Sequence, residues 1–203
     1  MKDFWNERYA KDEFVYGTHP NEWLRTQLEA LPPGRLLLPA EGEGRNAVFA
    51  ARCGWDVLGI DYSASGREKA TRLAREAGVE IDYQVADAYT YPYPESAFEA
   101  AALIFAHFPT NTRRTLWPKI ISALKPGGHL ILEVFRKTQI GLTSGGPKTP
   151  DLLYNLEEVR DEVPDITWDI LEEADVTLDE GPYHRGFARV LRGLGRRTAP
   201  ATL

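Results

Sequence analysis

One stretch near the start of the chain constrains its fold more than any other. Residues 35–40 form an apolar run of strand length, which ends at the turn Glu41-Gly42-Glu43-Gly44. A segment rich in alanine, residues 44–53, follows at once, and a second apolar run then ends in Asp61. A strand, a glycine turn at a helix start and an acid at the tip of the next strand together predict a nucleoside-binding unit.

The alternation of this unit continues along the chain. Apolar runs predict strands at residues 35–40, 56–61, 80–85, 98–104 and 128–135. The segments between them predict helices at residues 44–53, 63–77 and 111–124. Because the apolar runs are nearly continuous, we expect strands buried on both faces, as in a parallel sheet covered by helices. The order of elements predicts an α/β fold with right-handed crossovers.

Both ends of the chain depart from this alternation. Two predicted helices, residues 3–11 and 20–31, precede the first strand, with an aromatic loop between them. After residue 136 come a loop rich in glycine and proline, a short helix at residues 155–162, and two long strands at residues 165–178 and 185–193. A hairpin at the end of a parallel sheet is unusual for a simple dinucleotide-binding fold.

Composition narrows the class of protein. A length of 203 residues predicts a single domain, residues 1–203. The net charge of −6 argues against a nucleic-acid partner, which would need a basic surface. There is no apolar stretch of membrane-spanning length and no signal peptide, so we expect no membrane association and a cytoplasmic location. The single cysteine, Cys53, excludes a disulfide framework and a thiolate zinc cluster, and we expect no metal site.

The turn also indicates which nucleoside binds. Ala47 stands where the dinucleotide fingerprint has its third glycine. The carboxylates of Glu41 and Glu43 would repel a pyrophosphate. A ligand with a positive centre and no phosphate suits such a turn better, and S-adenosylmethionine has both properties.

Three residues near strand ends are further candidates. Asp61 can accept hydrogen bonds from ribose hydroxyls, although an acid there can also cap a helix. Asp87 can accept from an adenine amine while Ala88 contacts the ring edge, although Asp87 is also typical of a surface turn. His107 follows the fourth strand at the same edge and is the candidate catalytic residue, although a histidine beside aromatic residues is often only packed.

These segments, taken in order, resemble the motifs of class I S-adenosylmethionine-dependent methyltransferases: residues 36–47, Asp61, Asp87, residues 91–99 and residues 124–130. The turn Leu-Lys-Pro-Gly-Gly in the last of them is the most specific. The resemblance implies a three-layer, doubly wound, seven-stranded sheet of order 3-2-1-4-5-7-6 with strand 7 antiparallel. Such a topology would account for the terminal hairpin.

Finer features resemble the tellurite-resistance/thiopurine-type branch of small bacterial methyltransferases: residues 5–9, 16–21, 41–46, 144–148 and 183–186. The resemblance implies an N-terminal helical lid, residues 1–33, on a Rossmann-like core, residues 34–195. We expect a monomer or a homodimer.

The turn departs from the family pattern at one place. The family usually has an acid at the end of the first strand, where this chain has Leu38 and Pro39. Glu41 could supply that charge from a shifted position. The candidate cofactor-binding residues are Arg8, Tyr16, Ala40, Glu41, Gly42, Gly44, Asn46, Asp61, Tyr62, Asp87, Ala88 and Phe105.

The expected reaction is transfer of a methyl group to a small-molecule acceptor. Soft nucleophiles, such as thiols or selenium and tellurium oxyanions, need little help from a base, whereas an oxygen or nitrogen acceptor needs a base of matched pKa. His107 is the first candidate for that base and His184 the second.

The N-terminal aromatic residues are candidates for a lid. Trp5, Tyr9 and Tyr16 can exclude water and attract the sulfonium through their rings, and Arg8 can pair with the methionine carboxylate. The same residues can instead serve only to pack the N-terminal helices on the core. Two other functions stay open, a nicotinamide-dependent oxidoreductase and a non-catalytic S-adenosylmethionine-binding or regulatory domain.

Overall fold

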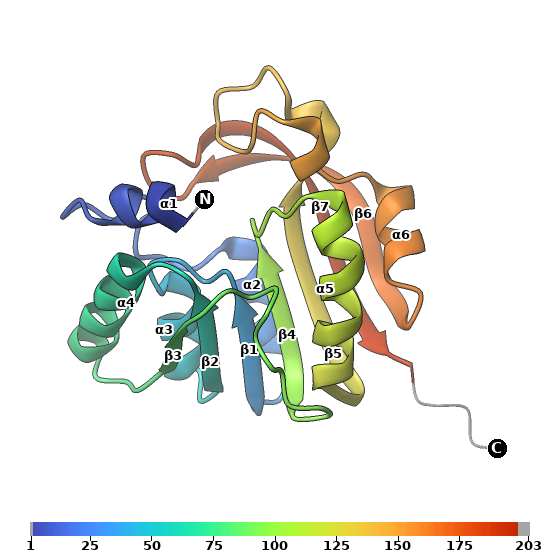
Figure 1. Cartoon of the computed structure of the whole chain (residues 1–203), viewed down its shortest axis with the longest axis horizontal. Coiled ribbons are helices and arrows are strands. Elements are labelled where there is room, and N and C mark those ends of the chain that lie inside the picture. Colours follow the sequence, from blue (N-terminus) through green and yellow to red (C-terminus); the bar gives the residue numbers. More distant parts are fainter. Residues whose placement is uncertain (1, 199–203) are drawn as a thin grey trace.

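The fold is a seven-stranded sheet between two layers of helices. The computed structural model describes residues 2–198 (Figure 1). The sheet order is β3-β2-β1-β4-β5-β7-β6, and β7 runs antiparallel to both of its neighbours. The bounds are β1 Arg35–Pro39, β2 Asp56–Asp61, β3 Asp82–Val85, β4 Phe98–Ile104, β5 Leu124–Phe135, β6 Ile166–Asp179 and β7 Arg185–Arg197. The strand order and the antiparallel strand 7 expected from the sequence are confirmed.

Helices cover both faces of this sheet. They are α1 Lys2–Tyr9, α2 Glu22–Ala30, α3 Arg45–Arg52, α4 Ala64–Ala77, α5 Thr110–Ala123 and α6 Leu156–Glu162, with short 3-10 turns at η1 Lys137–Gln139 and η2 Pro150–Leu152. Leu37 of β1 packs in a cluster with Leu116 of α5 and Val159 of α6. Its neighbour Leu36 packs with Leu24 of α2 on the other face. Successive residues of one strand therefore hold the two helical layers.

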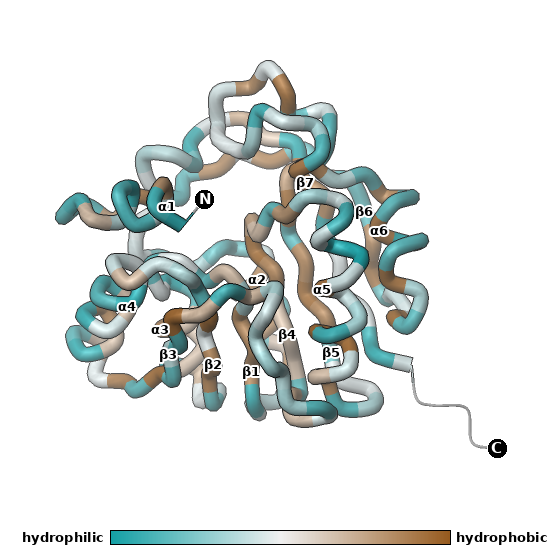
Figure 2. Tube along the Cα trace, in the orientation of Figure 1, coloured by the Kyte–Doolittle hydropathy of each residue, from teal (hydrophilic) through white to brown (hydrophobic). Residues whose placement is uncertain are grey.

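The strands are apolar because they are covered on both sides. Figure 2 shows hydrophobic residues concentrated along the central strands and hydrophilic ones on the outer helices. Leu36, Leu37 and Leu38 are at most 1% exposed. Parallel register pairs Pro39 with Ile60. The carboxyl ends of β1 and β2 therefore meet at one edge.

None of the helices in residues 2–198 is long and apolar enough to cross a membrane.

Strand lengths differ from the expected ones at two places. Strand β5 begins at Leu124, four residues before the predicted start, and its register with β4 shifts between Phe98 and Ala100. Strand β7 continues to Arg197, where the guanidinium binds the Ser122 carbonyl oxygen at 3.0 Å. A glycine-rich turn and a run of arginines look like strand ends in sequence, but long-range pairing keeps both segments extended.

Candidate functional site

The glycine turn after β1 has an unusual backbone conformation and lies in close contact with two helices. Ala40, Gly42 and Gly44 have φ angles of +57°, +68° and +88°. A Cβ atom on Gly44 would lie 2.4 Å from the Ala70 Cβ atom of α4, and one on Gly42 would lie 2.8 Å from the Tyr9 hydroxyl oxygen of α1. Both glycines are therefore required by close approach as well as by conformation, and α1 lies directly on the turn.

The carboxylate of Glu41 faces the start of α3. Its Oε1 atom accepts a hydrogen bond from the Ala47 backbone N–H at 2.7 Å. Burial raises the pKa of this carboxyl to about 7, against the opposing effect of the backbone hydrogen bonds. Glu41 therefore caps the start of α3 through this hydrogen bond, while burial makes its negative charge unfavourable.

The carboxylate of Glu43 binds the N-terminal loop. It accepts the backbone N–H of Val15 at 2.9 Å and that of Tyr16 at 3.3 Å. It also pairs with the Lys69 ammonium of α4 at 2.7 Å. From the sequence, we expect these loop carboxylates to suit a ligand with a positively charged centre. In the structure both are engaged by donors of the protein itself.

Asp61 joins the end of β2 to the glycine turn. Its Oδ2 atom accepts from the Gly42 N–H at 3.1 Å and its Oδ1 atom from the Ser63 N–H at 2.9 Å. Burial raises its pKa to about 6. Ser63 is the N-cap of α4, where its side chain accepts from the Gly66 N–H. Because an ionised carboxylate has about four acceptor positions, Asp61 keeps capacity for further donors.

The other predicted cofactor contacts are placed unevenly. Asp87 is exposed, and its Oδ1 atom accepts from the Tyr89 N–H at 2.9 Å, as in a surface turn. Ala88 is buried in the core. Tyr62 is half-buried beside Asp61, and burial raises its pKa to about 12. The Oδ1 atom of Asn46 accepts from the Asn21 backbone N–H at 3.0 Å, so this side chain holds the start of α2.

An aromatic cluster, defined as Tyr16, Phe105, Phe135 and His184, lies at the carboxyl ends of β4 and β5. Phe105 stacks on Phe135 with ring centroids 4.5 Å apart, and His184 meets Phe105 at 4.4 Å. Tyr16 meets His184 at 4.4 Å from the N-terminal side. Phe105 has a φ angle of +50°, a strained conformation that is often found at functional sites.

Both candidate bases lie beside Phe135. His107 stacks on it with centroids 5.6 Å apart, and its Nδ1 atom is 2.7 Å from the Leu152 carbonyl oxygen. Burial lowers the pKa of His107 to about 3. Burial also lowers the pKa of His184, whose Nδ1 atom is 3.7 Å from Glu180 Oε2. The ring of His107 is therefore neutral and weakly basic in this state.

Arg8 has aromatic neighbours and no acidic partner within residues 2–198. Its guanidinium lies 4.9 Å from the Tyr183 ring centroid and 4.4 Å from that of Phe4, and it donates to the Tyr16 hydroxyl at 3.3 Å. A positive group held this way is available to an anionic ligand group.

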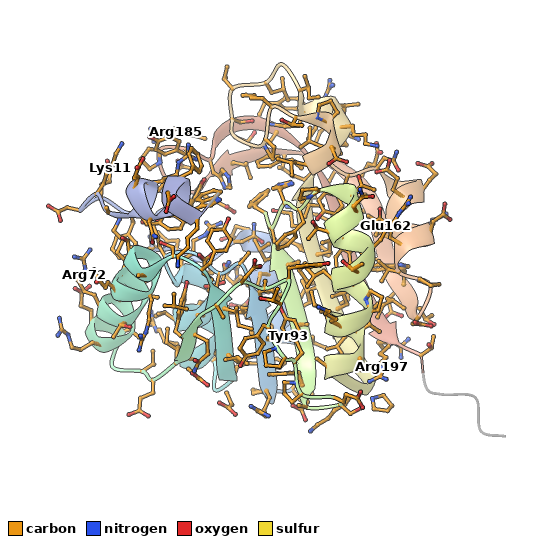
Figure 3. All side chains as sticks on the ribbon, in the orientation of Figure 1. Lys11, Arg72, Tyr93, Glu162, Arg185 and Arg197 are labelled. Carbon is orange, nitrogen blue, oxygen red and sulfur yellow. The ribbon has the colours of Figure 1, made fainter. Side chains whose placement is uncertain are left out.

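A buried polar network, which sequence reasoning missed, connects the N-terminal segment to the β6–β7 hairpin. The Asn21 amide donates to Glu133 at 2.7 Å and to Glu180 at 2.9 Å. Arg45 pairs with Glu180 at 2.8 Å, and Arg192 pairs with Glu133. Figure 3 shows the hairpin end, labelled at Arg185, beside the N-terminal segment, labelled at Lys11.

Two of the segments that resemble the methyltransferase branch, residues 144–148 and 183–186, lie next to the aromatic cluster. A Cβ atom on Gly145 would lie 2.7 Å from the His184 ring, and one on Gly146 would lie 2.9 Å from the Phe135 ring. These glycines therefore let the loop pack against the aromatic cluster. The sequence indicated that both segments matter, and the structure shows that they touch.

Comparison with known proteins shows that the chain is similar to methyltransferases. Residues 39–128 match the methyltransferase-domain family model. The chain is 30% identical over 105 residues to a demethylmenaquinone methyltransferase of Thermus thermophilus, covering 51% of this chain and 48% of that one. A protein of the same description from Renibacterium salmoninarum is 25% identical over 122 residues, covering 59% and 50%. The chain thus spans about half the length of these relatives.

Solved structures share the whole fold. One is described as converting a disulfide bond into a thioacetal group in echinomycin biosynthesis, with a TM-score of 0.78, 18% identity, and coverage of 98% of this chain and 92% of that one. TehB from Haemophilus influenzae has a TM-score of 0.73 and 12% identity, covering 97% and 67%. The match to a methyltransferase domain agrees with S-adenosylmethionine as the expected cofactor.

Proposed function

We propose that this protein transfers a methyl group from S-adenosylmethionine to a small-molecule acceptor. The match of residues 39–128 to a methyltransferase domain, together with Asp61 bound to the Gly42 N–H at the strand edge, carries the proposal. S-adenosylmethionine supplies an electrophilic methyl group, and the acceptor atom bonds to its carbon as the carbon–sulfur bond breaks and the electron pair stays on sulfur.

The donors and acceptors at this edge fit that cofactor better than a dinucleotide. Asp61 can accept ribose hydroxyls, and the exposed Asp87 can accept an adenine amine. Arg45, the only cation directly after the turn, is already paired with Glu180 at 2.8 Å. Arg45 therefore has no free charge for a pyrophosphate, and the carboxylate of Glu41 already occupies the Ala47 N–H at the start of α3, which weighs against a nicotinamide-dependent oxidoreductase.

The methionine end would lie toward the N-terminal segment. Arg8 offers a guanidinium without an acidic partner in residues 2–198, which suits a carboxylate. Tyr16 and Phe105 offer ring faces that attract a sulfonium. The backbone of Ala40, Gly42 and Gly44 would form the floor, and Tyr62 would flank the ribose.

We propose that residues 1–33 act as a lid as well as a packing element. Asn6 and Ser63 share a hydrogen bond of 2.9 Å between α1 and the start of α4, and Glu43 holds the loop at Val15. These contacts close the N-terminal segment over the glycine turn. Exclusion of water and alignment of the two reactants can together remove roughly 7–11 kcal/mol of barrier.

The basicity of His107 and His184 indicates which class of methyl acceptor fits the site. His107, with a pKa of about 3, is a poor base at neutral pH, and burial lowers the pKa of His184 in the same direction. An acceptor that needs little base assistance therefore fits best, such as a thiol or another soft nucleophile. The role of His107 as a base stays a prediction, as does the tellurite-resistance/thiopurine-type branch.

Calorimetry tests cofactor binding. We expect S-adenosylmethionine to bind and NAD not to bind. Asp61→Asn should weaken the binding of S-adenosylmethionine by about tenfold or more, because an uncharged amide accepts hydrogen bonds from ribose hydroxyls less strongly. Asp56→Asn is the matched control, since Asp56 lies exposed at the opposite end of β2, where it pairs with Arg35. Equal losses in the two variants would contradict the site.

A methyl-transfer screen tests catalysis. Thiols, selenite and small phenols are each incubated with S-adenosylmethionine, and S-adenosylhomocysteine release is measured. Turnover of any acceptor supports the proposal. Tight cofactor binding with no turnover on any acceptor would favour a non-catalytic binding or regulatory domain instead.

A further inference from the structure

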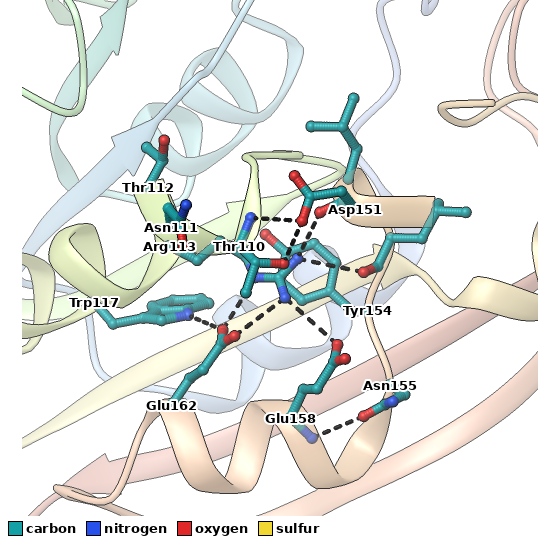
Figure 4. Close-up of polar contacts among 12 residues, drawn as sticks. Thr110, Asn111, Thr112, Arg113, Trp117, Asp151, Tyr154, Asn155, Glu158 and Glu162 are labelled. Carbon is teal, nitrogen blue, oxygen red and sulfur yellow. Dashed lines mark hydrogen bonds and ion pairs between the residues drawn. The ribbon is translucent and has the colours of Figure 1, made fainter. Parts of the chain in front are cut away.

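A buried arginine that the methyl-transfer proposal does not use lies against the segment that contacts His107. Arg113 of α5 is 1% exposed. Its Nε atom donates to Glu162 at 3.0 Å and its Nη2 atom to the other oxygen of that carboxylate at 3.1 Å (Figure 4). The Trp117 indole N–H donates to the same carboxylate at 3.2 Å. Such an ion pair is held in a fixed geometry, because a buried charge needs its partners.

The free edge of the guanidinium reaches the segment before α6. Its Nη1 atom donates to the carbonyl oxygens of Asp151 and Leu153, both at 3.3 Å. The carbonyl of Leu152, between them, lies 2.7 Å from Nδ1 of His107. Arg113 and His107 therefore bind three successive carbonyl groups of one segment.

Two outer contacts complete this arrangement, which we call the clamp (residues 106–113 with residues 151–154). The Thr110 hydroxyl donates to Asp151 Oδ1 at 2.6 Å, and the Tyr154 hydroxyl donates to the Ala106 carbonyl oxygen at 3.0 Å. The loop after β4, which carries His107, is thus bonded to residues 151–154 at several points. The clamp holds the Leu152 carbonyl oxygen against Nδ1 of His107.

The contact with Leu152 decides where the proton of His107 lies. A carbonyl oxygen only accepts hydrogen bonds, so Nδ1 must carry the proton. Burial and the positive charge of Arg113 both lower the pKa of this ring, which is therefore neutral at pH 7. The Nε2 atom then holds a lone pair, and it is buried without a hydrogen-bond partner among residues 2–198. A buried acceptor left unpaired is costly, so a ligand group that donates to it would be favoured.

We propose that Arg113 is a positioning residue that fixes His107 as the Nδ1–H tautomer, so that Nε2 selects an acceptor bearing a hydrogen-bond donor. The first half of this proposal concerns the protein alone. The second half rests on the proposed methyl transfer and narrows its acceptor to a compound with an O–H, N–H or S–H group, rather than a fully ionised oxyanion. The proton of that group leaves to solvent when the acceptor atom is methylated, because His107 is too weak a base to keep it at neutral pH. Phe135, stacked on His107, and Tyr154, at its edge, make the surroundings apolar and aromatic.

The tautomer is measured by nitrogen-15 NMR of the full-length protein labelled at histidine, at pH 7. The His107 signals are assigned by their loss in His107→Gln. We expect a pyrrole-type signal at Nδ1 and a pyridine-type signal at Nε2, whereas free neutral histidine favours the opposite tautomer. Observation of the Nε2–H tautomer or of a charged ring would overturn the proposal. This readout needs neither cofactor nor turnover, so its failure is distinct from failure of the proposed function.

Arg113→Lys tests the positioning role. Lysine keeps the positive charge beside Glu162 but cannot span two carbonyl groups, so we expect the His107 signals to move toward a mixture of tautomers. Thr110→Val, at the partly exposed outer end of the clamp, is the second variant in case Arg113→Lys does not fold, and it should cause a smaller shift of the same kind. His129 of β5 serves as an internal reference. An unchanged tautomer in the folded variants would overturn the role of Arg113.

The selected donor is tested with phenol and anisole, which differ only by the methyl group that caps the oxygen. Each is titrated into the protein saturated with S-adenosylhomocysteine. Phenol should shift the His107 Nε2 signal in the direction of a received hydrogen bond, and anisole should not. His107→Asn, which keeps a donor toward Leu152 but has no atom at the position of Nε2, should bind the two compounds equally. Equal Nε2 shifts with both compounds, or none with either, would overturn the selection of a donor-bearing acceptor.

Discussion

The hydroxyl oxygen of Tyr9 lies 2.8 Å from the position that a Cβ atom would occupy on Gly42. Helix α1 therefore rests on the glycine turn through a contact that leaves no room for any side chain. The turn must be glycine because of its φ angle and, separately, because of what lies on top of it.

Gly42→Ala should separate these two requirements. We expect a loss of about 2–4 kcal/mol in the free energy of unfolding, from strain at positive φ and from the clash with Tyr9. Gly127→Ala is the matched control, because Gly127 has a φ angle of +77° but nothing within 4 Å of its added Cβ atom. It should lose only about 1–2 kcal/mol. Urea unfolding measures both, and equal losses would show that the Tyr9 contact does not matter.

Glu43→Gln should loosen the N-terminal loop. The side chains of Glu43 and Lys69 are 2% and 7% exposed, so the variant leaves a buried ammonium without its counter-charge. We expect a loss of about 3–5 kcal/mol and faster amide exchange at Val15 and Tyr16. Glu29→Gln breaks an exposed ion pair with Arg25 and should cost under about 1 kcal/mol. A loss in Glu43→Gln no larger than that would contradict a locking role.

Glu41 should make the protein less stable as pH rises. Burial raises its folded pKa to about 7 from an ordinary value of 4.5, so the folded state binds the proton more tightly than the unfolded state does. The contribution of the protonated group is present below the unfolded pKa and is lost between about pH 4.5 and pH 7, by roughly 2–3 kcal/mol. Glu41→Gln keeps the acceptor toward Ala47 but cannot titrate. Chemical unfolding at several pH values should show a flatter profile for the variant, and parallel profiles would contradict the assignment.

Glu180 should behave in the opposite sense. Burial alone would raise its pKa, but Arg45 and His184 more than offset that effect and hold the pKa at about 2. Its contribution is therefore present above the unfolded pKa and is lost as pH falls toward 2. At pH 7, Glu180→Gln should destabilise the fold by about 3 kcal/mol and expose residues 16–21 to amide exchange.

Asp179→Asn provides the comparison for Glu180. Asp179 is the adjacent residue, and its pair with Arg185 is exposed on both sides. We expect neither amide exchange nor stability to change measurably in this variant. If both variants increased exchange at residues 16–21 alike, the hairpin tip rather than the buried carboxylate would be responsible.

The α/β alternation was predictable from the sequence because the relevant information is local and repeated. The apolar run of Leu36 to Leu38, the glycine turn and the apolar run ending in Asp61 each identify one element. The strand order followed instead from the resemblance to class I methyltransferases, which covers the terminal hairpin as well. The bounds of β5 and β7 were less predictable, because pairing with a neighbour extends a strand past residues that usually end one.

The site was only partly predictable, for a different reason. Sequence placed Asp61 and His107 at the carboxyl edge of the sheet, where the structure also has them, since strand ends meet there. It could not say that Glu41 faces Ala47 or that Glu43 faces Val15, because the direction of a carboxylate depends on which donors arrive from elsewhere. The tautomer of His107 likewise depends on Leu152, which lies 45 residues away in the sequence.

A Cβ atom on Gly181 would lie 2.5 Å from the Gly17 backbone nitrogen, so the hairpin tip and the N-terminal loop touch backbone to backbone. A nascent chain therefore cannot seat its N-terminal loop until the segment around residue 181 has left the ribosome. Strands β1 to β5 and the helices between them can form first, with the glycine turn already shaped by α3 and α4. The aromatic cluster is assembled last, because Tyr16 is synthesised early and His184 late.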